Sequence, residues 1–380
     1  MNAAALRTVS VAIVALVGAG TAWPQVLHGD LPRRAAVGVT LAIDAAGAVV
    51  ASAVADGSAA AEAGMQVGDV IAALDGTPAT SMVQVQSIIG RHRGGDSLPI
   101  DIVRGGEPKR LVARLKMFPF EQLPGTVFEY GHVTLPDGIR LRTIVSRPAA
   151  VTGPAPALFF IQGGGCSSID MPWAPPNIWP YALISGLAAR GFVTMRVDKP
   201  GAGESEGPPC PEGGFDAELA GYRAALHELK EDPAVDSTRI FLFGDSLGGF
   251  MAPLLANETR VAGISAYGTI AFTPTAYPGR SELFFREIAD VDILAAWAAV
   301  DVPSQLLHGA YDQVTTASDH AKIAATVNGA HPGLAEHREL EGVDHCGTRH
   351  ETLEASRDHC GGGKQVPELV AMVLEFVGTP

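Results

Sequence analysis

The spacing of apolar and polar residues divides the chain into two regions. In the first region, short runs with alternating or β-branched apolar positions predict strands, and Gly, Asp or Pro residues beside the runs favour turns. These runs occupy residues 37–41, 49–54, 69–74 and 98–104. The sequence therefore predicts a small domain rich in β-strands over residues 31–117.

Denser apolar runs follow residue 125, and polar residues are few within them. Runs of this kind predict buried strands. They occupy residues 156–161, 192–197, 239–243 and 302–307. The residues that follow each run include Gly together with Asp, Ser or Gln, so we expect the loops after these strands to present polar side chains.

The clearest candidate for chemistry is Gly244-Asp245-Ser246-Leu247-Gly248, a G-x-S-x-G sequence that directly follows the run at 239–243. A serine at a sharp turn from strand to helix needs these glycines, because larger side chains would collide with neighbouring backbone. The turn exposes the Ser246 hydroxyl. It also leaves Leu247 N–H at a helix N-terminus, where it can donate to a developing oxyanion. We predict Ser246 as a nucleophile.

A serine hydroxyl is a weak nucleophile and needs a base and an acid beside it. Candidates for both follow Ser246 in the chain, first an Asp and then a His. Asp312 lies in a loop after the run at 302–307, and His345 lies in a glycine-bounded loop near the C-terminus. We predict His345 as the base that accepts the Ser246 proton, and Asp312 as the acid that fixes the imidazole tautomer. Taken singly, each residue could be an ordinary cap, turn former or solvated side chain. Their order and strand contexts together favour catalysis.

The segment from about Gly125 to Pro380 resembles the α/β-hydrolase superfamily. Besides the Ser, Asp, His order, it has Gln162-Gly163-Gly164-Gly165 after a strand, similar to the glycine-rich oxyanion loop of the family, and a D-x-x-G-x-G-x-S turn that begins at Asp198. The family usually has histidine where this chain has Gln162. The resemblance implies an α/β fold with a mostly parallel, doubly wound sheet. It also implies a structural role for Asp198, and an oxyanion hole in which Gly164 or Gly165 donates beside Leu247.

The β-rich region resembles the bacterial PDZ domain, a small β-barrel-like fold. The resemblance depends on residues 57–71, in which a helix of small residues ends at a glycine and a G-D-x-I turn starts the next strand. It implies that a peptide or protein ligand adds a strand beside a groove. Val37, Gly38 and Val39 stand where the family binds a terminal carboxylate, and a helix at 81–89 would form the other wall. The alternative is a rigid appendage with an unused groove.

The N-terminus has the features of a secretory signal peptide. Arg7 supplies positive charge, residues 9–20 are apolar, and small residues precede a cleavage site after Ala22. The apolar run is shorter than the roughly 18–20 residues that span a bilayer. We therefore predict a secreted or periplasmic protein without a stable membrane span, and an uncleaved anchor is the alternative. The predicted organisation is a signal peptide at 1–22, a PDZ domain at 31–117, a linker at 118–125 and a catalytic domain at 126–380.

Composition narrows the possible partners. The chain has 380 residues, of which 47% are hydrophobic and 18% are charged, so two globular domains fit its length. The net charge of −14 and the lack of a basic stripe with interleaved aromatics argue against nucleic acid as a partner. We predict no cofactor.

An even number of cysteines in a chain predicted to be exported favours disulfides. The cysteines are Cys166, Cys210, Cys346 and Cys360. The hydrolase resemblance implies the pair Cys166–Cys210, because their loops follow adjacent strands in that fold, and it leaves Cys346–Cys360 as the second pair. Other connectivities remain open at this stage.

A zinc site near the C-terminus is an alternative use of the last two cysteines. Spacings that zinc could use occur at His345, Cys346, His350, His359 and Cys360. Such a site would take His345 out of catalysis, and an oxidising compartment favours the disulfide. We therefore predict no metal.

Three functional hypotheses follow. The first is an exported serine hydrolase that cleaves small or medium carboxylic esters through an acyl-enzyme. The second is a peptidase or amidase, because residues 131–148 resemble the opening hairpin of dipeptidyl- and acyl-peptidases. The third is a PDZ-led binding protein with an inactive hydrolase scaffold. The segment 268–300 is expected to line a substrate pocket with its aromatic residues, which are Phe272, Tyr277, Phe284, Phe285 and Trp297. The alternative is that residues 288–300, with Trp297, form an amphipathic helix packed against the sheet.

Overall fold

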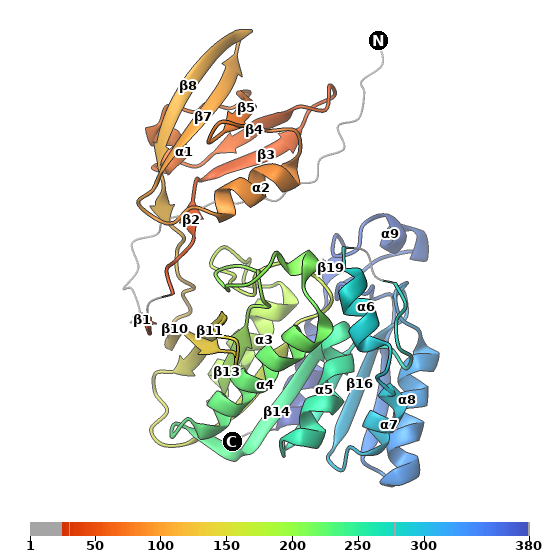
Figure 1. Cartoon of the computed structure of the whole chain (residues 1–380). Helices are drawn as coiled ribbons and strands as arrows, with labels where there is room; N and C mark the ends of the chain where they lie inside the picture. Colours follow the sequence, from red (N-terminus) through yellow and green to blue (C-terminus); the bar gives the residue numbers. More distant parts are fainter. Residues whose placement is uncertain (1–24, 30, 277–278, 379–380) are drawn as a thin grey trace. The chain divides into compact units, whose positions relative to one another are not determined.

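The computed structural model describes residues 25–29, 31–276 and 279–378. The described residues form two compact units (Figure 1), of which the first comprises residues 32–121 and the second comprises the others. The division lies inside the segment 118–125 that is predicted as a linker, and Leu31 groups with the second unit. The predicted signal peptide lies outside the described residues.

The first unit is built on an antiparallel sheet with the strand order β3-β4-β5-β7-β8, in which β6 pairs with β5. The four strands expected from the alternating pattern are all present. The strands are β2 (Ala35–Ala36), β3 (Val39–Ile43), β4 (Val49–Val54), β5 (Val70–Leu74), β6 (Thr77–Pro78), β7 (Ser97–Arg104), β8 (Glu107–Arg114) and β9 (Lys116–Met117). Two helices, α1 (Ala59–Glu62) and α2 (Met82–Gly90), begin at Ser58 and Ser81, whose side chains accept backbone N–H groups and so cap the helices.

The second unit contains a nine-stranded sheet with the order β1-β10-β11-β13-β12-β14-β15-β16-β17. Strand β11 is antiparallel to both of its neighbours, and the other neighbouring strands are parallel. The strands are β1 (Gln25–Leu27), β10 (Thr126–Thr134), β11 (Arg140–Pro148), β12 (Ala155–Ile161), β13 (Val193–Val197), β14 (Val235–Asp245), β15 (Gly263–Tyr267), β16 (Ser304–Gly309) and β17 (Ala335–Leu340). The predicted mostly parallel sheet is therefore confirmed.

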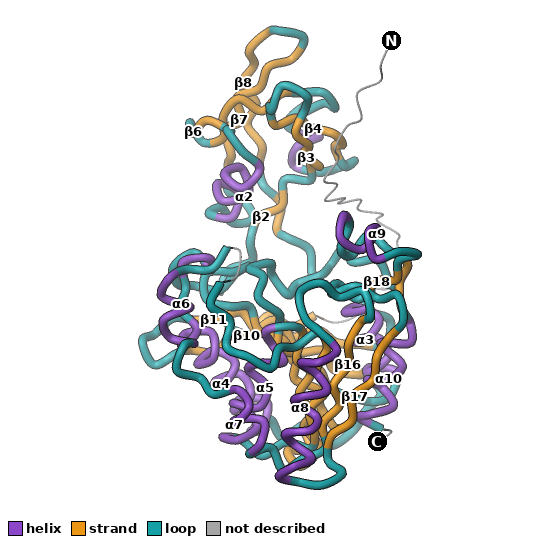
Figure 2. Tube along the Cα trace, turned by 90° about the vertical axis from the view of Figure 1, so that its right-hand side faces the viewer, coloured by secondary structure: helices purple, strands orange, loops and turns teal. Residues whose placement is uncertain are grey.

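Helices cover both faces of this sheet, as Figure 2 shows. One core lies under α3 and α10, and the other lies under α4, α5, α7 and α8. The helices are α3 (Trp179–Ala189), α4 (Phe215–Glu231), α5 (Leu247–Glu258), α6 (Glu282–Ile288), α7 (Ile293–Ala298), α8 (Ala317–Ala330), α9 (Leu353–Asp358) and α10 (Pro367–Val377), with a short 3-10 helix, η1 (Cys210–Glu212). A two-stranded ribbon joins β18 (Thr348–Arg349) to β19 (Lys364–Gln365).

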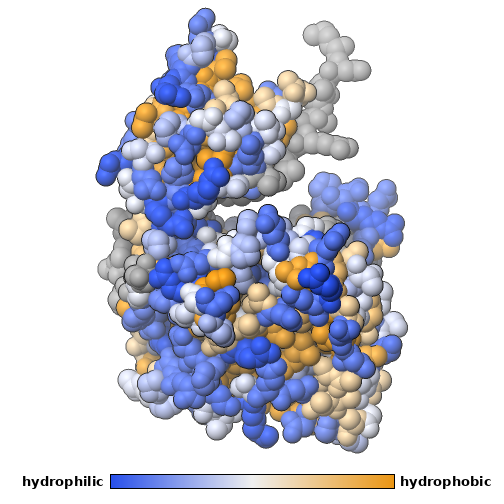
Figure 3. Space-filling model, viewed as in Figure 1, coloured by the Kyte–Doolittle hydropathy of each residue, from blue (hydrophilic) through white to orange (hydrophobic). Residues whose placement is uncertain are grey.

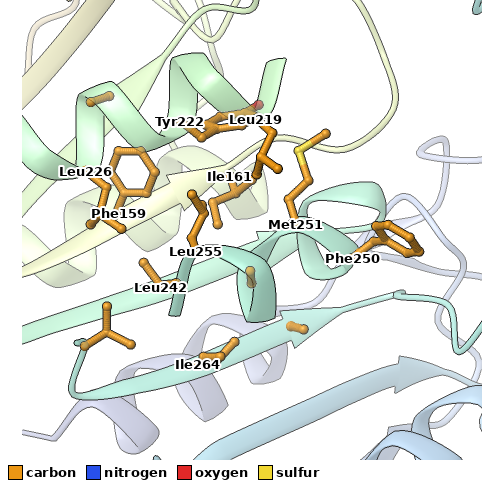
Figure 4. Close-up of a cluster of buried hydrophobic side chains, with 14 of the residues drawn as sticks. Phe159, Ile161, Leu219, Tyr222, Leu226, Leu242, Phe250, Met251, Leu255 and Ile264 are labelled. Atoms are coloured by element: carbon orange, nitrogen blue, oxygen red, sulfur yellow. The ribbon is translucent and has the colours of Figure 1, made fainter. Parts of the chain in front are cut away.

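The larger core holds α4 and α5 against the centre of the sheet. Figure 4 shows Tyr222 and Leu226 of α4 beside Phe159 of β12, with Leu242 of β14 and Leu255 of α5 close by. These side chains are at most 1% exposed, and burial of each contributes about 1.5–3 kcal/mol. The core therefore fixes the strand and helix on either side of the predicted nucleophile.

Strand β1 is absent from the sequence prediction, which leaves residues 23–30 unassigned. It pairs in parallel with β10 and extends the sheet at one edge. Three residues are too few to show a period of two, so a strand held by backbone pairing leaves little trace in the sequence.

In the view of Figure 3, hydrophilic and apolar residues are mixed on both units, and apolar residues gather on the lower half of the second unit. None of the described helices is both long enough and apolar enough to cross a membrane.

Candidate active site

Ser246 stands at the turn between β14 and α5. Its φ of 52° is unfavourable for a residue with a side chain, and Asp75 is the one other described non-glycine residue with a positive φ. The turn is tight, since a Cβ on Gly248 would lie 2.0 Å from Ile161 O, and a Cβ on Gly244 would lie 2.5 Å from Gly249 N. The two glycines of the sequence pattern are thus required by the backbone around them.

The structure brings the three predicted catalytic side chains into one hydrogen-bonded chain. His345 Nε2 lies 2.9 Å from Ser246 Oγ, and His345 Nδ1 lies 2.7 Å from Asp312 Oδ2. The Asp312 side chain is 0% exposed and that of His345 is 13% exposed. The carboxylate is therefore withdrawn from water while the imidazole remains partly accessible, an arrangement suited to moving a proton from Ser246 to His345.

The loop after β16 holds the Asp312 carboxylate in place. Oδ1 accepts the N–H groups of Val314 (2.7 Å) and Thr315 (2.9 Å), and Oδ2 accepts Thr315 Oγ1 (2.7 Å). These three hydrogen bonds orient the Asp312 carboxylate independently of its contact with His345. Thr315 is not among the residues predicted from the sequence, where the only signal for it is a hydroxyl residue three positions after an Asp in a turn.

Asp344 organises the loop that carries His345. The buried Asp344 carboxylate accepts Thr348 N–H at 2.7 Å and Gly361 N–H at 2.8 Å, and it lies 2.8 Å from His350 Nε2. Its oxygens are therefore occupied by the residues that follow, while the His345 ring bonds Asp312. Asp344 thus bonds residues of its own loop, and Asp312 is the carboxylate that contacts the imidazole.

The two disulfides implied by the hydrolase resemblance are present, as Cys166–Cys210 and Cys346–Cys360. Ligand atoms of Asp344, Cys346 and Cys360 lie within 4.8 Å of one another. Both sulfurs of this cluster are joined in the disulfide, and cysteine binds zinc only as a thiolate, so neither sulfur can serve as a ligand. The Cys346–Cys360 disulfide closes the loop beside His345.

The predicted oxyanion donors lie on two elements. Leu247 is the first residue of α5, so its N–H has no acceptor within the helix. Gly163, in the loop after β12, lies against the turn, because a Cβ there would be 3.1 Å from Ser246 Cβ. The same glycine lies against Asp245, since a Cβ there would be 3.1 Å from Asp245 Oδ2. Gly164 and Gly165 stay as predicted donors beside Leu247.

Charges around the site favour the protonated imidazole. Burial by itself would lower the pKa of His345, but the hydrogen bond and charge of Asp312, with the charges of Asp245 and Asp344, raise this pKa above its usual value. Burial tends to raise the pKa of Asp312, and its bonds to His345 and Thr315 outweigh that effect and lower it. Asp245 is different, since burial raises its pKa to about 6.

These charges predict the pH dependence of activity. His345 must be neutral to act as a base, so kcat/KM should rise with pH through an apparent pKa above the ordinary histidine value of about 6.5. The pKa of Asp245 lies in the same range, so the acidic limb of the wild-type pH profile reflects the titration of both His345 and Asp245. The Asp245→Asn variant should move this limb to lower pH by up to about one unit, because it removes a charge that favours the imidazolium.

The measurement is kcat/KM against pH for the wild type and Asp245→Asn. Asp236→Asn, at the opposite end of β14, is the matched control and should leave the limb unchanged. An acidic limb at the same pH in all three proteins would contradict the assigned coupling between Asp245 and His345.

Other residues singled out in the sequence fall outside the site. Asp198 accepts Ile169 N–H at 2.7 Å and Ser168 Oγ at 2.9 Å, which agrees with a structural role. Phe284 and Trp297 are 0% exposed and belong to the larger core, so the pocket expectation is wrong for both and the packing alternative holds for Trp297. Phe272 is 52% exposed, and Tyr277 lies outside the described residues.

In the first unit, the predicted carboxylate loop Val37–Val39 joins β2 to β3. Gly38 has a φ of 77°, and a Cβ there would lie 2.2 Å from Ser58 Cβ, so the position requires glycine. Helix α2 contacts β3. The segments predicted to form the two walls of a peptide groove are thus neighbours, and binding by Val37, Gly38 and Val39 stays a prediction.

Family models match both units. A model described as PDZ domain matches residues 35–115, and a model described as Serine aminopeptidase, S33 matches residues 181–291. The second match includes Ser246 and ends before Asp312 and His345.

Similar proteins include peptidases and an esterase structure. Dipeptidyl-peptidase 5 of Porphyromonas gingivalis is 27% identical over 135 residues, which are 34% of this chain and 19% of that protein. A probable periplasmic serine endoprotease, DegP-like, of Ectopseudomonas mendocina is 37% identical over 76 residues, which are 20% and 16% of the two chains. The match thus spans less than a fifth of these relatives. Est1E from Butyrivibrio proteoclasticus with bound ferulic acid aligns with a TM-score of 0.49 and 18% identity over 64% of this chain and 96% of that one.

The sheet order and the matched family models agree with the two resemblances stated from the sequence. The PDZ match covers nearly all of the first unit, and the serine aminopeptidase match covers the turn that presents Ser246. The chain therefore consists of a PDZ domain followed by a serine hydrolase domain with the α/β-hydrolase fold.

Proposed function

We propose that this protein is an exported serine hydrolase that cleaves carboxylic esters through Ser246, His345 and Asp312. The observation that carries the proposal is the chain of contacts from Ser246 Oγ to His345 (2.9 Å) and from His345 to Asp312 (2.7 Å). The strained backbone of Ser246 supports it, because such strain is common where a side chain must be presented to a substrate.

In this mechanism Ser246 Oγ attacks the ester carbonyl while its proton passes to His345 Nε2. The imidazolium is stabilised by Asp312 and returns the proton to the leaving alcohol. Leu247 N–H and a donor from Gly164 or Gly165 hold the oxyanion, and loss of one such donor costs about 10²–10³-fold in kcat. Water, activated by His345, then cleaves the acyl-enzyme.

Amide hydrolysis is the second candidate activity. It is favoured by the serine aminopeptidase model over residues 181–291 and by the partial likeness to a dipeptidyl-peptidase. The same three side chains serve both reactions, since His345 can protonate a leaving amine as well as an alcohol. The acyl and leaving groups decide between the two activities.

The remaining elements of the proposal concern binding and location. The PDZ domain would bind an extended peptide or protein segment at β3 through Val37, Gly38 and Val39, with α2 as the second wall. Two disulfides support export, because such bonds persist in oxidising compartments. The N-terminal residue of the protein recovered from the periplasm or medium tests cleavage after Ala22.

The first experiment treats the purified, oxidised protein with a fluorophosphonate probe beside Ser246→Ala, and mass spectrometry locates the adduct. We expect stoichiometric labelling of Ser246 and none in the variant. A folded wild type that resists the probe would contradict an activated serine and favour the hypothesis of a PDZ-led binding protein.

A matched substrate panel then separates the two activities. Esters and anilides with the same acyl or aminoacyl group and p-nitrophenol or p-nitroaniline as leaving group are compared by kcat/KM. Turnover of acyl esters without anilides supports the esterase, and efficient cleavage of aminoacyl anilides supports the peptidase.

A further inference from the structure

A buried lysine touches the loop that carries the predicted oxyanion donors. Lys199 follows β13, and its Nζ donates a hydrogen bond to Gly163 O. Its side chain is 0% exposed, and Nζ lies 3.3 Å from Oε2 of Glu218, whose side chain is 2% exposed. The ammonium is therefore placed inside the protein at the back of the loop.

Glu218 and Arg280 hold this lysine in place. Arg280 forms an ion pair with Glu218 in the middle of α4, and its guanidinium lies 4.1 Å from the centre of the Phe284 ring. Arg280 Nη1 also lies 3.3 Å from Cys166 Sγ and 3.4 Å from Cys210 Sγ. The disulfide closes the same loop three residues after Gly163, so one buried network contacts the loop at two points.

Because the peptide bond is planar, the hydrogen bond to Gly163 O also sets the direction of the N–H of the next residue, Gly164. In a trans peptide the C=O of one residue and the N–H of the next point in opposite directions. Because Lys199 holds Gly163 O toward the interior, Gly164 N–H is directed away from the buried network. The preceding residue, Gly163, lies against Asp245, since a Cβ on Gly163 would be 3.1 Å from Asp245 Oδ2. A Cβ on Gly165 would meet nothing within 4 Å, so the loop faces open space directly beyond.

We propose that Lys199 is a positioning residue that fixes Gly164 N–H as the loop donor of the oxyanion hole. This inference depends on the proposed serine hydrolase function. Lys199 does not touch the reacting atoms; it acts through the plane of the peptide bond between Gly163 and Gly164. Glu218, which is itself paired with Arg280, keeps the Lys199 side chain at that carbonyl.

A purely structural role for Lys199 predicts something different. If the lysine only balanced Glu218, its removal would change the free energy of unfolding and leave the folded enzyme unaltered in rate. Removal of one partner of a buried ion pair commonly destabilises a protein, but in Lys199→Met the Glu218 carboxylate keeps its ion pair with Arg280. Lys199→Met is therefore informative, because methionine fills much of the space without a donor.

The experiment measures kcat and KM for a p-nitrophenyl ester and for the matching thionoester, whose C=S sulfur is a poorer hydrogen-bond acceptor. For Lys199→Met we expect kcat on the ester to fall by about 10–100-fold with little change in KM, since Gly164 N–H is misaligned rather than lost. The rate ratio of ester to thionoester should fall as well. Lys199→Gln retains a donor and should recover part of the kcat on the ester and part of the rate ratio. Lys322→Met, which changes an exposed lysine of α8, should match the wild type in kcat and in the rate ratio.

An unchanged ester-to-thionoester ratio in folded Lys199→Met would overturn the inference. If Lys199→Met does not fold, Lys199→Leu, which also lacks a donor, is measured in its place, and a wild-type ratio in that variant overturns the inference. Failure of the proposed function is distinct, because the wild type itself would then neither turn over esters nor react with the fluorophosphonate at Ser246.

Discussion

His345→Ala should lower kcat/KM on the best ester by roughly 10⁴–10⁶-fold. The variant leaves Ser246 Oγ without the imidazole that lies 2.9 Å away, so the hydroxyl has no base to accept its proton during attack. The leaving group also loses its proton donor. KM should change far less than kcat, because the imidazole interacts mainly with atoms that react.

The double variant Ser246→Ala with His345→Ala tests whether the two side chains act as one unit. Groups of this kind are strongly non-additive, so the double variant should be no slower than the worse single variant. His359→Ala is the matched control, since His359 is exposed in the same C-terminal region and belonged to the alternative zinc hypothesis. A loss of activity in His359→Ala comparable to that in His345→Ala would contradict the assignment of His345 as the base.

Local sterics explain why the nucleophile turn could be predicted from sequence. Gly244 and Gly248 face backbone atoms at distances that exclude a Cβ, so any chain with this turn must show the same short pattern. The parallel strands around it are dense apolar runs, which makes their type predictable. Asp312 and His345 follow from chain order once the fold is assumed.

Long-range contacts explain what the sequence did not predict. Lys199, Glu218 and Arg280 are distant in the chain and meet only because β13, α4 and the segment before α6 pack together. No local periodicity marks such a network. Thr315 is near Asp312 in sequence, but many turns contain that pair of residue types, so the contact at 2.7 Å needs the structure.

The segment 268–300 shows a different limit. Aromatic residues near an active site can line a pocket or fill a core, and both uses produce the same composition. Phe284 and Trp297 are fully buried while Phe272 is half exposed, a distinction set by how α6 and α7 pack on the sheet. Sequence spacing alone could not separate the two uses.

Asp312→Asn should lower kcat by about 10⁴-fold while the fold stays intact. The carboxylate accepts His345 Nδ1–H, which leaves Nε2 free of a proton and able to accept one from Ser246. An asparagine can present its NH₂ group to Nδ1 and so favour the tautomer with the proton on Nε2. That imidazole cannot serve as a base toward Ser246, and the charge that stabilises the imidazolium is also lost.

Asp344→Asn is the matched comparison, because it changes a buried carboxylate directly beside His345 in sequence. Its oxygens bond Thr348, His350 and Gly361 rather than the His345 ring, so the variant should lower the free energy of unfolding and leave kcat within about tenfold of the wild type. Both variants are measured at a pH above the acidic limb, with thermal unfolding recorded for each. A 10⁴-fold loss in folded Asp344→Asn with near-normal Asp312→Asn would reverse the assignment of the acid, since the tautomer of His345 would then be set from within its own loop.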